Sequence, residues 1–273
     1  MTADSPARRF LLHASLIALC TFMVFPIVWA AITSFKPTNA IFDVALPGDP
    51  TLANYTAAVS SFPLWRLLGN TFVMAAAVTL GQLVLAILAA YALARFRFRG
   101  KTLAWTLIIG TILFPPQILI TPMYIMTARM GMIDTFAGLI VPQLAVGAFG
   151  VFLLRQHVLS VPQSLFDAAE LDGAKEREIL RMIVLPAVRP ALGALGIVYF
   201  ISSWNEYLWP LLATEDLAST TIQVGLQTFI PETGGQWGPL MAAGTLSTIP
   251  VMVVYLFAQR RIINAFMQAG VRR

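Results

Sequence analysis

The sequence predicts an all-α integral membrane protein with six transmembrane helices. Apolar residues make up 58% of the 273 positions and charged residues 11%, and the mean hydropathy of +0.77 is too high for a soluble domain. The apolar residues gather in six runs of about 20, the length at which an α-helix crosses the hydrocarbon core. The longest polar interruption is 161–190. We expect the whole chain, 1–273, to form one transmembrane domain.

The first three expected spans cover residues 10–32, 71–94 and 103–126. For the first, the alternative is a cleaved signal peptide. We favour a retained helix, because the run is long for a signal sequence and no obvious cleavage site follows it. A proline-containing segment separates the first two spans, with one short helix expected near 52–60. A basic hairpin, 95–101, separates the second span from the third.

The third span contains Pro115, Pro116 and Pro122. Each proline leaves a backbone carbonyl of the helix without its usual donor. Inside a membrane such carbonyls must be satisfied by protein or by water. Two interpretations stay open, a simple kinked helix and a broken helix beside a translocation path.

The last three expected spans cover residues 136–154, 191–213 and 240–258. The fourth contains Pro142. A polar loop without Lys or Arg, 214–239, joins the last two spans, and a short basic tail ends the chain.

The loop charges orient these spans, because Lys and Arg gather in the cytoplasmic loops of membrane proteins. One side has 15 basic residues and the other has three, namely Lys36, Arg66 and Arg129. The 15 are Arg8, Arg9, Arg95, Arg97, Arg99, Lys101, Arg155, Lys175, Arg177, Arg181, Arg189, Arg260, Arg261, Arg272 and Arg273. We therefore expect both termini and the segment 161–190 to be cytoplasmic. This topology explains the net charge of +5 without a nucleic-acid partner.

The segment 161–190 carries nine charged residues, and the positions of its capping, glycine and proline residues predict two short helices. Ser164 is expected to cap the first helix, with Asp167 as the reciprocal acceptor. Gly173 allows a sharp turn, because a residue without Cβ tolerates a positive φ. The second helix is expected over about 174–184, with Pro186 ending it. A solvated loop and a surface on which another protein docks both fit this pattern.

The order of small, acidic and apolar residues in this segment resembles the EAA motif of ABC importer permeases. The matching residues are Asp167-Ala168-Ala169, Gly173 and Ile183-x-Leu185-Pro186, and Asp172 before Gly173 is also usual. The departure is Asp167 where the family usually has Glu. The resemblance extends to the stretches 34–37, 54–55, 90–101, 204–211 and 268–272. Over nearly its whole length the chain is similar to the smaller, second permease of the carbohydrate, maltose-type (class 1) importers.

This resemblance implies the type I ABC importer permease fold, with a cytoplasmic coupling loop over 157–190. It implies that this loop contacts the ATPase through Asp167, Ala168, Ala169, Asp172, Gly173, Ile183, Leu185 and Pro186. It also implies that the C-terminal tail contacts the ATPase, at Gly270 and Val271. The implied partners are a second, non-identical permease, an ATP-binding cassette ATPase dimer, an extracellular solute-binding protein and the lipid of the inner membrane.

The implied solute is a sugar or an oligosaccharide. The stretches 135–141 and 205–210 also resemble the glycerol-3-phosphate branch of the family. The absence of Lys and Arg from every expected span argues weakly against an anionic solute. A secondary transporter is a further alternative, because it uses ionisable residues inside the membrane.

The sequence shows no catalytic motif. Gly100-Lys101-Thr102 resembles the end of a phosphate loop, but Arg95 occupies the position of the required first glycine. We therefore expect no enzymatic activity, no cofactor and no metal in this chain. Glu206, beside Asn205, is the one acidic residue well inside an expected span. It lies either on the substrate path or in an interfacial belt formed by Trp204, Tyr207 and Trp209.

Overall fold

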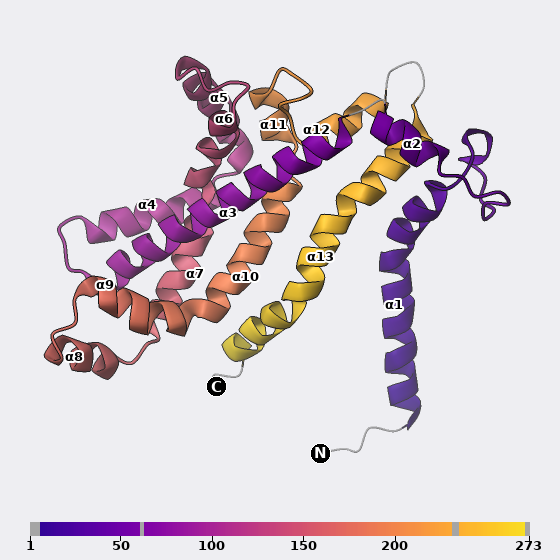
Figure 1. Ribbon diagram of the computed structural model, residues 1–273. Helices are drawn as coiled ribbons and strands as arrows, with labels where there is room; N and C mark the ends of the chain where they lie inside the picture. The colour runs from indigo at the N-terminus through magenta and orange to yellow at the C-terminus, as the bar shows by residue number, and fades with distance from the viewer. Residues whose placement is uncertain (1–5, 61–62, 231–234, 271–273) are drawn as a thin grey trace. The chain divides into compact units, whose positions relative to one another are not determined.

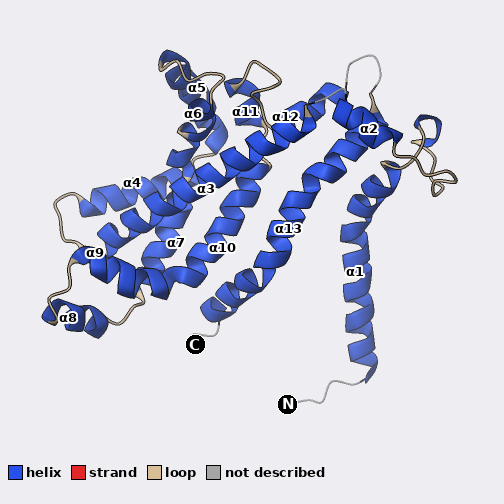
Figure 2. Cartoon of the chain, in the orientation of Figure 1, coloured by secondary structure: helices blue, strands red, loops and turns tan. Residues whose placement is uncertain are grey.

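The structure is a computed structural model that describes residues 6–60, 63–230 and 235–270. Throughout these ranges the regular structure is helical (Figure 2), so the all-α class predicted from the sequence is confirmed. Four helices are long and apolar enough to cross a membrane, and six spans result if each of two bent helix pairs counts as one. The α-helices are α1 Pro6–Thr33, α2 Ala53–Ser60, α3 Leu64–Arg95, α4 Lys101–Leu113, α5 Ile120–Arg129, α6 Phe136–Ile140, α7 Ala148–Leu159, α8 Gln163–Leu171, α9 Glu176–Ile179, α10 Leu185–Trp204, α11 Leu208–Ala213, α12 Ile222–Gly225 and α13 Trp237–Gly270. Short 3-10 turns lie at Thr38–Ala40, Pro116–Leu119, Pro142–Val146 and Leu226–Phe229, and a π-turn lies at Leu180–Val184.

The chain divides into two compact units, which are described separately. Unit 1 comprises Met1–Trp65 and Gly225–Ile249, and unit 2 comprises Arg66–Val224 and Pro250–Arg273. The single domain over 1–273 that the sequence suggests therefore stays a prediction.

A network of hydrogen bonds in the segment that follows α1 holds unit 1 together. Lys36 is fully buried, and its Nζ donates to the backbone oxygen of Asp43 at 2.6 Å while lying 4.4 Å from the ring centroid of Trp29. The Asn54 amide donates to the backbone oxygens of Ser34 and Lys36, both at 2.8 Å. Gly238 of α13 packs so closely on Asn54 that a Cβ has no space. These contacts connect the end of α1 to α2 and to the start of α13.

Unit 2 has its core between α3, α7 and α10; in Figure 1, α3 crosses α7, and α10 lies next to α7. Small residues of α3, such as Ala86 and Ala90, allow close approach of the neighbouring helices. Leu154 of α7 and Leu195 of α10 fill the same core. Phe166 of α8 belongs to it as well, so the polar segment is anchored in the hydrophobic core of unit 2.

The third expected span is broken, which excludes a simple kinked helix; its place beside a translocation path stays a prediction. Helix α4 ends at Leu113, and the helical stretch 116–129 leaves at an angle of 103° to it. Phe114 is extended, with φ −87° and ψ 128°, because the residue before a proline is pushed out of the helical region. The stretches 136–145 and 148–159 are also bent relative to each other, by 49°.

The fifth expected span, 191–213, was wrong as a continuous helix. Helix α10 ends at Trp204, and α11 begins only at Leu208. Other helices differ from the expected spans only in where they begin or end. Helix α3 begins seven residues before the expected 71, and α13 continues past 258 through the tail to Gly270. A helix does not stop where the hydrocarbon stops, because charged residues such as Arg are good helix formers.

Candidate functional site

The segment 161–190 contains one short helix, α8, which a tight turn joins to the start of a second helix at α9. Helix α8 is capped at its end by Asp172, and Gly173 follows with φ +76°. The backbone N–H of Lys175 donates to Oε2 of Glu178 at 2.7 Å, which fixes the start of α9. The turn needs a residue that tolerates the left-handed region, and Gly173 provides it.

Two details of the sequence prediction were wrong. Helix α8 begins at Gln163 with Pro162 before it, so Ser164 lies in the first turn and does not cap the helix. Pro186 does not end the second helix, because 176–204 continues as one helical element through the π-turn. A proline clashes with the carbonyl four residues earlier and lacks an N–H. The wider π-turn immediately before Pro186 accommodates both effects.

Side chains at the C-terminal end of α3 hold α8 and α9 in place. Arg95 forms an ion pair with Glu170, donates to Oε1 of Gln163 at 3.4 Å and lies 4.3 Å from the ring centroid of Phe166. The hydroxyl of Tyr91, one helical turn earlier, donates to Glu176. We call these contacts of Arg95 and Tyr91 the clamp. They connect the polar segment mechanically to a long transmembrane helix.

The clamp was missed by the sequence analysis. Arg95 counted there as a topological charge, as the residue that argues against a phosphate loop and as part of the family resemblance, and Tyr91 carried no role beyond that resemblance. The available signal was the spacing of four between Tyr91 and Arg95, which places both on one face of a helix. Phe166 gave a further signal, because an aromatic residue in a polar helix needs a buried position.

The structure separates the eight residues expected to contact the ATPase into two groups. Asp167, Ala168, Asp172, Gly173 and Pro186 are exposed, whereas Ala169, Ile183 and Leu185 are partly buried and pack against the core of unit 2. The first group is therefore accessible to a partner, and the second group attaches the segment to the core of unit 2.

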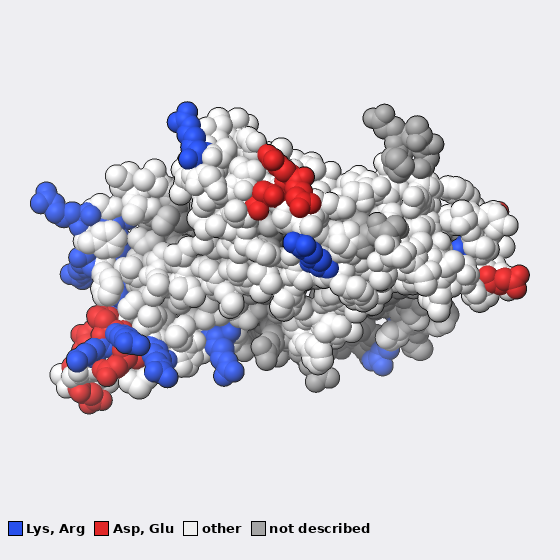
Figure 3. All heavy atoms as spheres, turned by 45° about the horizontal axis from the view of Figure 1, so that its top comes forward, with Lys and Arg blue, Asp and Glu red and all other residues white. Residues whose placement is uncertain are grey.

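Two large apolar side chains extend the exposed surface of α8. Leu171 is 89% exposed and Leu165 is 51% exposed. Together with the exposed Asp167 and Ala168, these side chains form a surface of α8 that the described residues leave uncovered. We call the surface formed by Leu165, Asp167, Ala168, Leu171 and Gly173 the docking face. In Figure 3, acidic and basic side chains gather where α8 and α9 lie.

The structure describes one of the two tail residues that were expected to contact the ATPase. Gly270 is the last residue of α13, so the tail up to this point is helical. Val271 lies outside the described residues.

Asn205 and Glu206 lie in the break between α10 and α11. The Asn205 amide donates to the backbone oxygen of Ile201 at 2.9 Å, and Oε1 of Glu206 accepts from the backbone N–H of Trp209 at 3.2 Å. Glu206 therefore caps the first turn of α11, which is a local role that a carboxylate performs well.

The expected aromatic belt was wrong for the two tryptophans next to this break. Trp204 is 1% exposed and Trp209 is 2% exposed. The indole N–H of Trp209 donates to the backbone oxygen of Gly138 at 3.1 Å. Tyr207 is 36% exposed. The tryptophans pack inside unit 2 because each finds an apolar neighbour for its ring, and Trp209 a partner for its N–H.

Asp134 organises the loop that follows α11. Its carboxylate accepts from the hydroxyl of Ser219 and from the backbone N–H groups of Glu215, at 3.2 Å, and Asp216, at 3.4 Å. The hydrogen bond from Ser219, helped by the two backbone N–H groups, holds the pKa of Asp134 below its ordinary value of 3.8. Asp134 has φ +62°, a conformation that Asp tolerates better than most residues.

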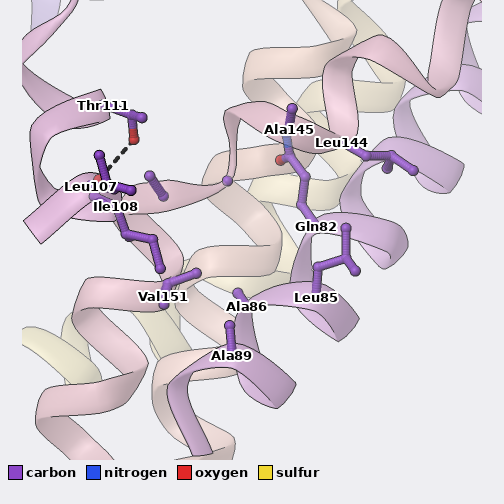
Figure 4. Close-up of a pocket in the computed structure, with 12 residues that line it drawn as sticks. Gln82, Leu85, Ala86, Ala89, Leu107, Ile108, Thr111, Leu144, Ala145 and Val151 are labelled. Carbon is purple, nitrogen blue, oxygen red and sulfur yellow. Dashed lines mark hydrogen bonds between the residues drawn. The ribbon is translucent and has the colours of Figure 1, made fainter. Parts of the chain in front are cut away.

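A cavity of about 390 Å³ lies between α3, α4 and α7 (Figure 4). Its lining is largely apolar, with Leu107 and Val151 among the lining residues. The hydroxyl of Thr111 donates to the backbone oxygen of Ile108 at 2.7 Å, and the amide of Gln82 donates to the backbone oxygen of Gln143 at 2.8 Å. The polar groups of this cavity are thus engaged within the protein, and the lining offers no reactive constellation.

Comparison with known proteins identifies the kind of protein that this architecture belongs to. Residues 82–267 match the family described as "binding-protein-dependent transport system inner membrane component". The chain belongs to this family. The sn-glycerol-3-phosphate transport system permease protein UgpE of Agrobacterium fabrum is 35% identical over 280 residues, covering 98% of this chain and 99% of that protein.

Solved structures show the same fold. A chain of a bacterial ABC transporter involved in the import of the acidic polysaccharide alginate superposes with a TM-score of 0.83 at 24% identity, covering 95% of this chain and 99% of its own. A chain of the alginate ABC transporter in complex with an alginate pentasaccharide-bound periplasmic protein gives a TM-score of 0.68 at 16% identity, covering 92% of this chain and 93% of its own.

Family membership confirms the resemblance to ABC importer permeases and the predicted fold class. The chain is a multi-pass component of the inner membrane, and it is a transport component and not an enzyme.

Proposed function

We propose that this chain is one permease subunit of an ATP-driven importer of a carbohydrate-class solute. It forms the translocation path together with a second, non-identical permease. An ATPase dimer on the cytoplasmic side supplies the energy, and an extracellular solute-binding protein delivers the solute. The relatives and the matching fold support this assignment.

The observation that carries the proposal is the way unit 2 presents its docking face. The clamp and Phe166 fix α8 to the base of α3, while Leu171 and the side chain of Asp167 face outward. A rigidly held but exposed helix transmits a movement of its partner to the helices behind it. Asp167 also accepts a hydrogen bond from the Gln163 amide at 2.9 Å, which orients its carboxylate at the edge of this face.

In this proposal the docking face and both termini are cytoplasmic. The bias of 15 basic residues against three supports this orientation. The tail, with Gly270 and Val271, gives the ATPase a second contact beside the coupling segment.

The solute is a sugar or an oligosaccharide in the main form of the proposal. The second candidate is glycerol 3-phosphate, which the name of the 35% identical relative favours. Asn205 and Glu206 are proposed to border the substrate path, because the break between α10 and α11 exposes polar groups next to a transmembrane helix.

The test is affinity purification of the tagged chain from membranes, followed by identification of its stoichiometric partners. The proposal expects a second permease and an ATPase in the complex, and ATP-dependent uptake when the complex is reconstituted with its binding protein. Isolation of a stable, transport-competent chain without any ATPase would contradict it and would favour a secondary transporter.

A further inference from the structure

A second cavity, of about 490 Å³, lies at the base of unit 2 beside the coupling segment. The end of α3, the hairpin 95–101, the end of α7 and the start of α8 form its walls. Three of its lining residues are cationic, Arg95, Arg97 and Lys101, and none of the lining residues is acidic. The amide of Gln163 adds a neutral donor. The cavity therefore favours an anion.

The cationic side chains around this cavity have donors to spare. Lys101 uses one hydrogen of Nζ on the backbone oxygen of Phe96 at 2.9 Å, and two remain. Arg97 is exposed, and the structure records no polar partner for it among the described residues. The Nε of Arg95 is buried without an acceptor, although its other nitrogens contact Glu170 and Gln163. An anion with several oxygens matches this set of donors, because guanidinium groups bind phosphate oxygens in pairs.

The hairpin places this cavity at a membrane surface. It joins α3 to α4, which are both apolar helices, and it alternates Arg and Phe from Arg95 to Arg99. Phe96 is 39% exposed and Phe98 is 46% exposed. Exposed aromatic side chains between cationic ones are typical of the level at which lipid headgroups lie. A phosphate that belongs to a membrane lipid is therefore within reach of the cavity.

We propose that this cavity binds the phosphate group of an anionic phospholipid. The phosphate accepts hydrogen bonds from Arg97 and Lys101 and lies beside Arg95, while the acyl chains lie along the apolar surface of α4. Because Arg95 also belongs to the clamp, the bound lipid stabilises the position of α8. Free inorganic phosphate has the same oxygen chemistry, and the experiment distinguishes the two sources. The site itself does not depend on transport activity, and only its assignment to the cytoplasmic leaflet rests on the proposed function.

The experiment measures lipid adducts on the purified complex by native mass spectrometry, with added phosphatidylglycerol or phosphatidylcholine. The variants are Arg97→Gln and Lys101→Gln, and the matched control is Arg99→Gln, which removes one charge from the same hairpin without touching the cavity. We expect each cavity variant to lose phosphatidylglycerol affinity by about fivefold, the effect of one cationic contact near a membrane. The control is expected to stay near the unmodified protein, and phosphatidylcholine to bind weakly to all of them.

Two outcomes would overturn the proposal. An equal loss in Arg99→Gln would mean that diffuse interfacial charge, and not the cavity, retains the lipid. Displacement of the lipid by millimolar inorganic phosphate, with phosphate binding lost in Arg97→Gln, would assign the cavity to free phosphate. The readout needs only an assembled complex, so a failure of transport in these variants does not affect it.

Discussion

Removal of the Arg95 guanidinium should loosen α8 without unfolding unit 2. The variant Arg95→Met keeps an apolar stem of similar length but loses the ion pair, the Gln163 contact and the ring contact. Glu170 is 53% exposed, so the ion pair contributes about 0.2–1 kcal/mol. The contact with the Phe166 ring, at 4.3 Å, adds about 0.5–1 kcal/mol. The sum of about 0.7–2 kcal/mol corresponds to about a three- to thirtyfold change in the local opening equilibrium.

Hydrogen–deuterium exchange on the purified complex measures this opening directly. In Arg95→Met, peptides covering 163–172 should exchange about three- to thirtyfold faster, while peptides from the middle of α3 should be unchanged. The matched control is Arg99→Met, which removes the same group from an exposed position of the same hairpin outside the cavity and should leave exchange in α8 unaltered. Unchanged exchange of 163–172 in Arg95→Met would show that Phe166 and the chain connections alone hold α8, and that the clamp has no mechanical role.

Three further predictions concern the other polar groups. The pKa of Asp134 is lowered by folding, so its contribution to stability is present above the ordinary carboxyl pKa and is lost as pH falls through the lower, folded value. Asp134→Asn should therefore lower the thermal midpoint at pH 7, and this difference should shrink as the pH falls below the ordinary value of 3.8. A difference that does not change with pH would exclude this role. Glu206→Ala should reduce uptake more than it reduces assembly of the complex. Glu206→Gln keeps an oxygen that can cap α11 but removes the charge, so it separates the two roles. Loss of assembly in both variants would assign Glu206 to packing. Reporter fusions after Arg177 and after Ser219 should report the cytoplasm and the outside, respectively, and a cytoplasmic signal at Ser219 would reverse the proposed topology.

The sequence was most informative where local chemistry decides the structure. The positive φ of Gly173 and the short helix over 53–60 were predicted because glycine tolerance and helical propensity are local properties. The break near Pro115 was one of two open interpretations, because a proline indicates a distortion but not its angle. The angle of 103° between the two helical stretches therefore could not be predicted from the prolines alone.

Long-range contacts account for what the sequence did not predict. The clamp joins Arg95 to Glu170, which is 75 positions later in the chain, and no local pattern indicates that pairing. Trp204 and Trp209 looked interfacial from their neighbours, but tertiary packing buries both. Pro186 looked like a helix end because its effect on a regular helix was considered without the π-turn before it.

The central claim is that the segment 161–190 couples this chain to an ATPase, and Gly173→Leu tests it most directly. Among the described residues, and apart from its two chain neighbours, no atom lies within 4 Å of a Cβ at this position, so we expect the clash to arise with a docked partner. The φ of +76° adds backbone strain of about 1–3 kcal/mol, which weakens docking about tenfold or more. Gly173→Asn is the matched control for strain, because Asn has a similar size but tolerates positive φ.

The measurement is the amount of ATPase that co-purifies with the tagged variant, determined together with solute uptake. We predict that Gly173→Leu reaches the membrane and keeps its partner permease but loses the ATPase and transport, with Gly173→Asn retaining more ATPase than Gly173→Leu. Full ATPase retention with normal uptake in Gly173→Leu would contradict the account, because the docking face would then not be the coupling element.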